Sequence, residues 1–175
     1  MAQAGVHVRQ ADRGHSLIDY WPLVSLILVS ALAALAIVAG SGQTTMRSFM
    51  HAYMGVFLIF FALLKIFDLE EFKDGFAMYD LIAMLNSTWG YVYPFIELAL
   101  GLGYLAFLWP PALYVATIIV FIFGAVGVII ALRKGLDIAC PCMGNVLAVP
   151  LSTVTLTEDG IMAAMALSLL TTPVG

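Results

Sequence analysis

The sequence predicts an all-α integral membrane protein, a compact antiparallel bundle of five transmembrane helices with one short amphipathic helix. Three observations support this fold class. Hydrophobic residues make up 63% of the 175 positions and charged residues only 10%, more apolar surface than a soluble domain of this size can bury. The apolar residues gather into runs of about 20, the length that crosses a bilayer. Two of these runs are joined only by Trp109, Pro110 and Pro111, which forces an antiparallel hairpin.

Five runs are expected to span the membrane, and they lie at about 21–40, 49–67, 91–109, 112–132 and 154–172. The first run is longer than the core of a signal peptide, about 7 to 15 residues, and is therefore taken as a span. The last is the weakest, because it begins with TLTEDG and becomes continuously apolar only at Ile161. Residues 1–16 lack apolar periodicity and are expected to form a mobile tail, which leaves 17–175 as a single transmembrane domain.

Two further patterns describe how the spans connect and pack. Between the second and third runs, Phe72, Phe76, Tyr79 and Ala83 recur at helical spacing, which predicts either an amphipathic helix on the membrane surface or a connector packed on the bundle. Small residues in the third and fourth runs predict close helix contacts. These residues are Ala99, Gly103, Gly124 and Gly127.

The charges argue against a nucleic-acid partner and indicate how the chain is oriented. The net charge is −4 and no basic run occurs, so the expected partner is the lipid bilayer. If all five runs cross, five Lys and Arg residues lie on the side of the N-terminus and only Arg47 lies opposite. The positive-inside rule then predicts a cytoplasmic N-terminus in a bacterial inner membrane, with the cysteine-containing loop at the cytoplasmic face.

The only two cysteines, Cys140 and Cys142, flank Pro141 in the stretch IACPCMGN. Thiols two residues apart can form a disulfide, but so small a ring is strained and easily reduced, which favours thiol exchange over a structural role. The proline holds a turn between them. Two other interpretations remain open: Cys140, Cys142 and Met143 form a soft site for Cu(I) or another thiophilic ion, or the cysteines are apolar packing residues.

Other familiar catalytic motifs are absent from the sequence. It contains no phosphate-binding glycine loop, no HExxH, no paired CxxC and no GxSxG. Besides the cysteines, the candidates for chemistry are therefore the ionisable residues in or near the spans, because such residues are costly in a membrane and mark functional sites.

The ionisable residues gather on the side of the cysteines. Lys65 lies near the end of the second run and Glu97 near the start of the third, so the two can form a pair. Such a pair would tune the pKa of the thiols or pass protons; the alternatives are a purely structural ion pair or a snorkelling lysine. Glu158 and Asp159 lie at the start of the last run. Acidic residues are favoured at a helix N-terminus by the helix dipole, so a capping role is expected there. A role in metal entry or in proton transfer is the alternative. His51, on the other side, is expected to be interfacial.

These stretches together resemble the MauE-like branch of the MauE/DoxX family of redox-associated membrane proteins. The likeness covers about residues 46–170 and includes the polar positions. It lies in LLKIFDLEEFKDGFAMYDLIA, YVYPFIELALGLGYLAF, GVIIALRKGLDI and CPCMGNVLAVPLSTVTLTEDG. The resemblance implies a four-helix core that handles thiols, preceded in this branch by an additional N-terminal helix. It also implies a thioredoxin-like partner, as for MauE in the maturation of methylamine dehydrogenase, or a heavy-metal-associated domain protein.

The resemblance assigns roles to particular residues. It makes Cys140 and Cys142 the redox pair. The polar positions that match the family without a known role are Lys65, Asp68, Glu97, Glu158 and Asp159. Since exported proteins are oxidised outside the cytoplasm, a cysteine loop that re-enters the bundle and is reached from either side is the favoured arrangement.

Three functions follow from these residues. The leading hypothesis is a thiol-disulfide redox component, an oxidoreductase in protein maturation or electron relay. The second is transport or handling of a soft metal by the same cysteines. The third is a non-catalytic assembly subunit of a membrane complex.

Overall fold

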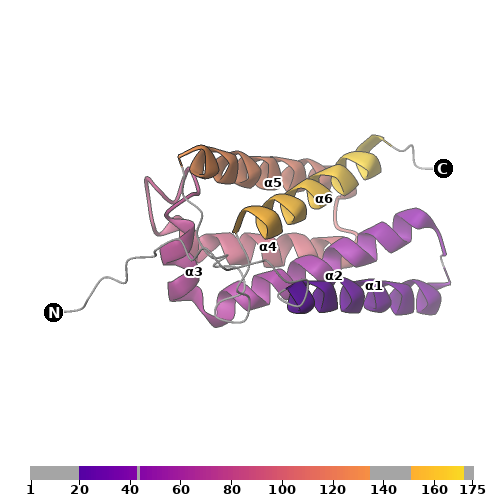
Figure 1. Cartoon of the computed structure of the whole chain (residues 1–175). Helices are drawn as coiled ribbons and strands as arrows, with labels where there is room; N and C mark the ends of the chain where they lie inside the picture. Colours follow the sequence, from indigo (N-terminus) through magenta and orange to yellow (C-terminus); the bar gives the residue numbers. More distant parts are fainter. Residues whose placement is uncertain (1–19, 43, 135–150, 172–175) are drawn as a thin grey trace.

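The computed structural model describes residues 20–42, 44–134 and 151–171, with side chains from residue 154 onward in the last stretch. Every helix or strand assigned in this part of the chain is an α-helix (Figure 1), which confirms the all-α prediction for it. The helices are α1 (Trp21–Ser41), α2 (Met46–Phe67), α3 (Leu69–Phe76), α4 (Trp89–Leu105), α5 (Pro110–Arg133) and α6 (Leu151–Thr171).

Four of the five expected spans are long and apolar enough to cross a membrane, namely α1, α2, α5 and α6. The remaining one, α4, has 17 residues and ends at Leu105, short of the roughly 20 that a span needs. It ends early because Phe107 and Trp109 adopt left-handed backbone conformations, with φ of 50° and 38°. The two prolines that follow then begin α5.

The first turn of the bundle is encoded locally. α1 is followed by Gly42 in the left-handed conformation, with φ of 70°, which glycine adopts without steric cost. Two residues after position 43, Thr45 caps α2, because its side-chain oxygen accepts a hydrogen bond from the backbone N–H of Ser48 at 3.1 Å. The chain therefore reverses, and α1 packs on α2.

The helices pack as two close pairs, α2 with α4 and α5 with α6, and α1 lies against α2. Figure 1 shows α5 and α6 on one side of α2 and α4, with α1 at the edge of the bundle. α3 lies where α2 ends and α4 begins (Figure 1). We call this the α3 end; α5 also ends there and α6 begins there. The opposite end carries the start of α2, the end of α4 and the start of α5.

Two glycines set the contact between α2 and α4. A Cβ atom on Gly101 of α4 would lie 3.0 Å from the carbonyl oxygen of Gly55 and 3.1 Å from the backbone nitrogen of Ile59, both in α2. These are backbone atoms, so a larger side chain forces the helices apart. Sequence inspection did not single out Gly55 or Gly101.

The expected close helix contacts are found at two of four positions, Gly103 and Gly124, whereas Gly127 packs on the connector after α3. A Cβ on Gly103 would lie 2.7 Å from the Leu113 side chain, and one on Gly127 would lie 2.7 Å from the carbonyl oxygen of Tyr79. Gly124 packs against α6, as described below. Ala99 is exposed and makes no such contact, because it lies on the outer face of α4.

The stretch expected to be amphipathic forms the short helix α3 and an irregular connector. The rings of Phe72 and Phe76 pack on Tyr93 of α4, with centroids 6.2 and 4.7 Å away. The helix ends at Phe76, and Tyr79 and Ala83 are buried in the turns that follow. These contacts match the interpretation of a connector packed on the bundle.

Candidate functional site

A lysine and a glutamate form a buried ion pair at the α3 end. Lys65, in the last turn of α2, donates to both carboxylate oxygens of Glu97 in α4, at 2.7 and 2.6 Å. Their side chains are only 3% and 1% exposed. Lys65 therefore does not snorkel to the membrane surface, and the pairing that the sequence allowed is present.

Two more carboxyl groups reach this pair from α6. Glu158 Oε1 lies 3.9 Å from Lys65 Nζ, and Asp159 is 3% exposed and interacts electrostatically with Lys65 and Glu97. The expectation that Glu158 and Asp159 cap this helix is wrong, because α6 already begins at Leu151, about two turns earlier. We call Lys65, Glu97, Glu158 and Asp159 the charged cluster.

Aromatic rings enclose the lysine of the charged cluster. The Lys65 ammonium lies 5.7, 5.8 and 5.3 Å from the ring centroids of Phe61, Phe72 and Tyr93. This apolar environment shields Lys65 from bulk solvent and lowers the local dielectric, so the electrostatic interactions of the ion pair are stronger than at a surface.

Three members of the charged cluster, Lys65, Glu158 and Asp159, line a small cavity. Its volume is about 10 Å³, and its walls include Lys65, Tyr93, Thr155 and Asp159. Asp159 Oδ2 is buried and has no hydrogen-bond partner among the described residues. Tyr93 and Thr155 were not singled out in the sequence, because nothing in an apolar run marks which hydroxyl faces inward.

The other predicted site residues lie elsewhere. Asp68 is exposed, and its side chain caps α3 by accepting from the backbone N–H of Glu71 at 3.4 Å. It is not part of the charged cluster. Cys140, Pro141, Cys142 and Met143 lie outside the described residues, as does the mobile tail expected at 1–16.

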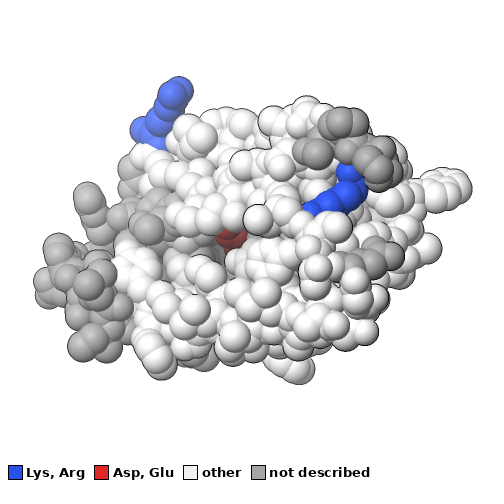
Figure 2. Space-filling model, turned by 90° about the vertical axis from the view of Figure 1, so that its right-hand side faces the viewer, with Lys and Arg blue, Asp and Glu red and all other residues white. Residues whose placement is uncertain are grey.

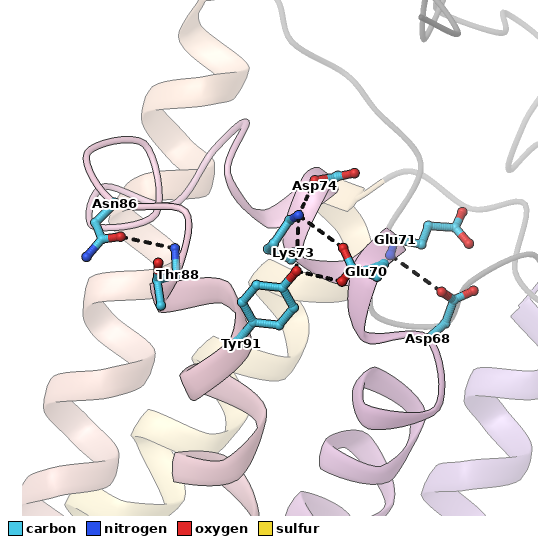
Figure 3. Close-up of polar contacts among 8 residues, drawn as sticks. All are labelled: Asp68, Glu70, Glu71, Lys73, Asp74, Asn86, Thr88 and Tyr91. Carbon is cyan, nitrogen blue, oxygen red and sulfur yellow. Dashed lines mark hydrogen bonds and ion pairs between the residues drawn. The ribbon is translucent and has the colours of Figure 1, made fainter. Parts of the chain in front are cut away.

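An exposed polar network lies beside the charged cluster, on the outer side of α3 (Figure 3). The Tyr91 hydroxyl donates to Glu70 at 2.6 Å, and Lys73 donates to Glu70 at 3.1 Å. The Tyr91 hydrogen bond, followed by that of Lys73, lowers the pKa of Glu70. Hydrogen bonds from Lys73 to Asp74 and Glu70 raise the pKa of Lys73. The network ties α3 to α4 at the surface.

A second buried polar centre, which we call the His51 centre, lies at the opposite end. The His51 ring contacts the Tyr114 hydroxyl and the Tyr104 carbonyl oxygen, and stacks on Phe107 with centroids 4.4 Å apart. The Tyr104 hydroxyl donates to Thr117 at 3.0 Å. His51 is fully buried, so the expectation of an interfacial histidine is wrong. The loop after α4 covers it, which sequence inspection did not show.

Figure 2 views this opposite end of the molecule. The described surface is almost entirely uncharged: one Lys or Arg side chain projects at the edge of the view and another lies on the face, and an acidic side chain is visible only at the bottom of a hollow. Among the described residues, no three His, Cys, Asp or Glu side chains are arranged to hold a metal ion.

The helices and this cluster define an all-α integral membrane protein with ionisable groups enclosed by its bundle. The chain belongs to the family described as methylamine utilisation protein MauE, whose family model matches residues 43–172. The match begins after α1, so the family part comprises α2 to α6. Comparison with curated proteins and with solved structures gives no match.

Proposed function

We propose that the protein is a membrane-embedded thiol-disulfide redox component in which Cys140 and Cys142 form the reactive dithiol. The supporting observation is that the chain's only cysteines lie in the connection between α5 and α6. Those two helices end and begin at the α3 end, where the charged cluster is buried. Membership of the MauE family supports the same assignment.

The proposed thiol-disulfide exchange takes place in two steps. The thiolate of one cysteine attacks a disulfide of a thioredoxin-like or client protein, which forms a mixed disulfide and releases one partner thiolate. The second cysteine then attacks the mixed disulfide and releases the other partner thiolate. Two electrons pass from the Cys140–Cys142 pair to the partner, and two protons follow. The reverse sequence oxidises the partner.

Thiol trapping tests this proposal in the full-length protein. Air-free purification followed by alkylation and mass spectrometry should show that Cys140 and Cys142 convert reversibly between dithiol and intramolecular disulfide. The variants Cys140→Ser and Cys142→Ser should lose exchange, and one of them should accumulate a mixed disulfide with its partner. Full exchange activity in both variants would contradict the proposal.

Soft-metal handling is the alternative, with Cys140, Cys142 and Met143 as ligands for Cu(I) or another thiophilic ion. Elemental analysis of the same reduced sample separates the two functions, because stoichiometric copper would favour the metal role. Met143→Leu provides a control, since it should weaken metal binding and leave thiol exchange intact. Wild-type behaviour of every cysteine variant would leave only the assembly-subunit function.

We further propose that α4 is a fifth span and that the N-terminus lies in the cytoplasm of a bacterial inner membrane. α4 packs closely along α2, which is long enough to cross. Single cysteines at the exposed positions Asn86 and Leu108, in a background lacking the native cysteines, test this with a membrane-impermeant thiol reagent. We expect labelling of Leu108→Cys from outside and of Asn86→Cys only after the cytoplasmic face is opened. Labelling of both from one side would exclude the fifth span.

A further inference from the structure

Asp159 has an oxygen atom for which the described structure provides no hydrogen bond. Its side chain is 3% exposed, and Oδ2 has no partner among the described residues. The atom faces α5, where a Cβ on Gly124 would lie 3.1 Å from it. A buried, unsatisfied carboxylate oxygen costs several kcal/mol or more, on the order of the desolvation penalty of an ion. Something must therefore satisfy it.

The cavity beside Asp159 limits what that ligand is. Its volume of about 10 Å³ is close to the smallest space that holds one water molecule, roughly 10 to 15 Å³. Larger organic ligands and hydrated cations do not fit. The walls offer polar partners for one water, since Lys65, Thr155 and Asp159 all line the cavity.

The charges that face Asp159 do not balance. Lys65 comes from α2, Glu97 from α4, Glu158 from α6 and Asp80 from the connector after α3, while Gly124 of α5 adds no charge. Tyr93 of α4 adds a neutral phenol. Lys65 is already engaged by both oxygens of Glu97. With one cation among four carboxyl groups in the part of the chain that the structure describes, coupled titration favours a state in which at least one carboxyl is neutral and holds a proton.

We propose that Asp159 is a proton-binding carboxyl group of the membrane interior, and that the adjoining cavity holds one water molecule through which this proton exchanges. Protonated Asp159 donates its O–H to that water, and deprotonated Asp159 accepts from it, so that Oδ2 is satisfied in both states. The site does not depend on the proposed thiol chemistry, because neither cysteine takes part in the argument for it.

Infrared spectroscopy of the protein in lipid nanodiscs tests this site directly, through the carbonyl stretch of protonated carboxyl groups. At neutral pH the wild-type protein should show this band, and transfer to D₂O should shift it, because an exchangeable proton is bound. Asp159→Asn should lose the share of the band equivalent to one carboxyl group. Asp74→Asn, at an exposed position, is the matched control and should keep it.

A glycine pair provides a second test if Asp159→Asn fails to fold. Gly124→Ala brings a methyl group against Oδ2, whereas Gly160→Ala adds the same group where no atom lies within 4 Å. The band should move in Gly124→Ala and stay in place in Gly160→Ala. Absence of the band in the wild type, its full retention in Asp159→Asn, or its loss only in Glu158→Gln would overturn the proposal. So would an unchanged band in Gly124→Ala.

Discussion

The charged cluster and the His51 centre are both buried in the bundle, at opposite ends, yet they differ in how well their polar groups are matched. At the His51 centre, histidine, tyrosine and threonine form hydrogen bonds, Arg47 donates to the Tyr114 hydroxyl, and no carboxyl group among the described residues takes part. At the charged cluster, three carboxyl groups share one lysine, and Asp159 Oδ2 has no partner among the described residues. A matched network fixes structure, whereas an unmatched one retains the capacity to change charge.

The largest expected effect is at the charged cluster. Lys65→Met keeps an unbranched side chain but removes the cation that pairs with Glu97, and should lower the free energy of unfolding by about 3 to 5 kcal/mol, the cost of breaking a buried pair. The loss should shrink at low pH, where the carboxyl groups gain protons. Denaturant unfolding in detergent measures both. An effect no larger than that of Lys73→Met, at the exposed network, would contradict this expectation.

The His51 centre should respond less and without a change in charge. Tyr114→Phe removes the hydroxyl that contacts the His51 ring, and should cost about 1 to 3 kcal/mol, because a buried ring nitrogen loses its partner. Combining it with His51→Leu should cost less than the sum of the two single changes. The same unfolding assay serves here. Strictly additive losses would show that the contact does not couple the two residues.

A third change tests whether the two centres depend on the same helix pair. Gly101 lies between Glu97 and Tyr104 on α4, and Gly101→Ala forces α4 away from α2. Overpacking of this kind costs about 1 to 3 kcal/mol. Gly160→Ala, in open space, should be close to neutral. If Gly101→Ala reduces the stability losses caused by both Lys65→Met and Tyr114→Phe, the two centres depend on the same helix pair. Unchanged losses for both variants would show that they do not.

The smallest effect is expected at the exposed network of Figure 3, which contrasts with both buried centres. The pKa of Glu70 is lowered in the folded protein, first by Tyr91 and then by Lys73. Its contribution to stability is therefore present above the unfolded-state pKa and is lost as the pH falls through the lowered folded-state pKa. Tyr91→Phe should reduce this slight acid dependence of the unfolding midpoint. An unchanged pH profile would show that the Tyr91 hydrogen bond does not stabilise the fold.

The sequence predicted the parts of the fold and site that depend on composition and on the order of the helices. The apolar runs predicted where the helices lie. Because successive spans cross the bilayer in opposite directions, the end of the second and the start of the third lie on the same side, which places Lys65 and Glu97 together. The sequence did not predict which side chains surround this pair in the folded protein. The α6 helix extends beyond its apolar run to Leu151, so Glu158 and Asp159 lie inside the helix rather than at its start.

The remaining errors arise from the loop between α4 and α5. Left-handed conformations at Phe107 and Trp109 shorten α4, and no local pattern announces them in residues that rarely adopt this conformation. In the same loop, the Phe107 ring stacks on the His51 ring. Burial of His51 is thus a tertiary effect, and the roles of Cys140 and Cys142 remain predictions from the sequence and the family.

The buried charges also bear on the order in which the chain is assembled during synthesis. A single lysine or acid at the centre of an inserting helix costs about 2.5 to 3.5 kcal/mol. α2 and α4 emerge first, and their Lys65–Glu97 pair cancels one such cost as soon as they meet. α6 emerges last, with Glu158 and Asp159 on the same helix. It therefore enters the membrane most readily against a helix pair that has already formed.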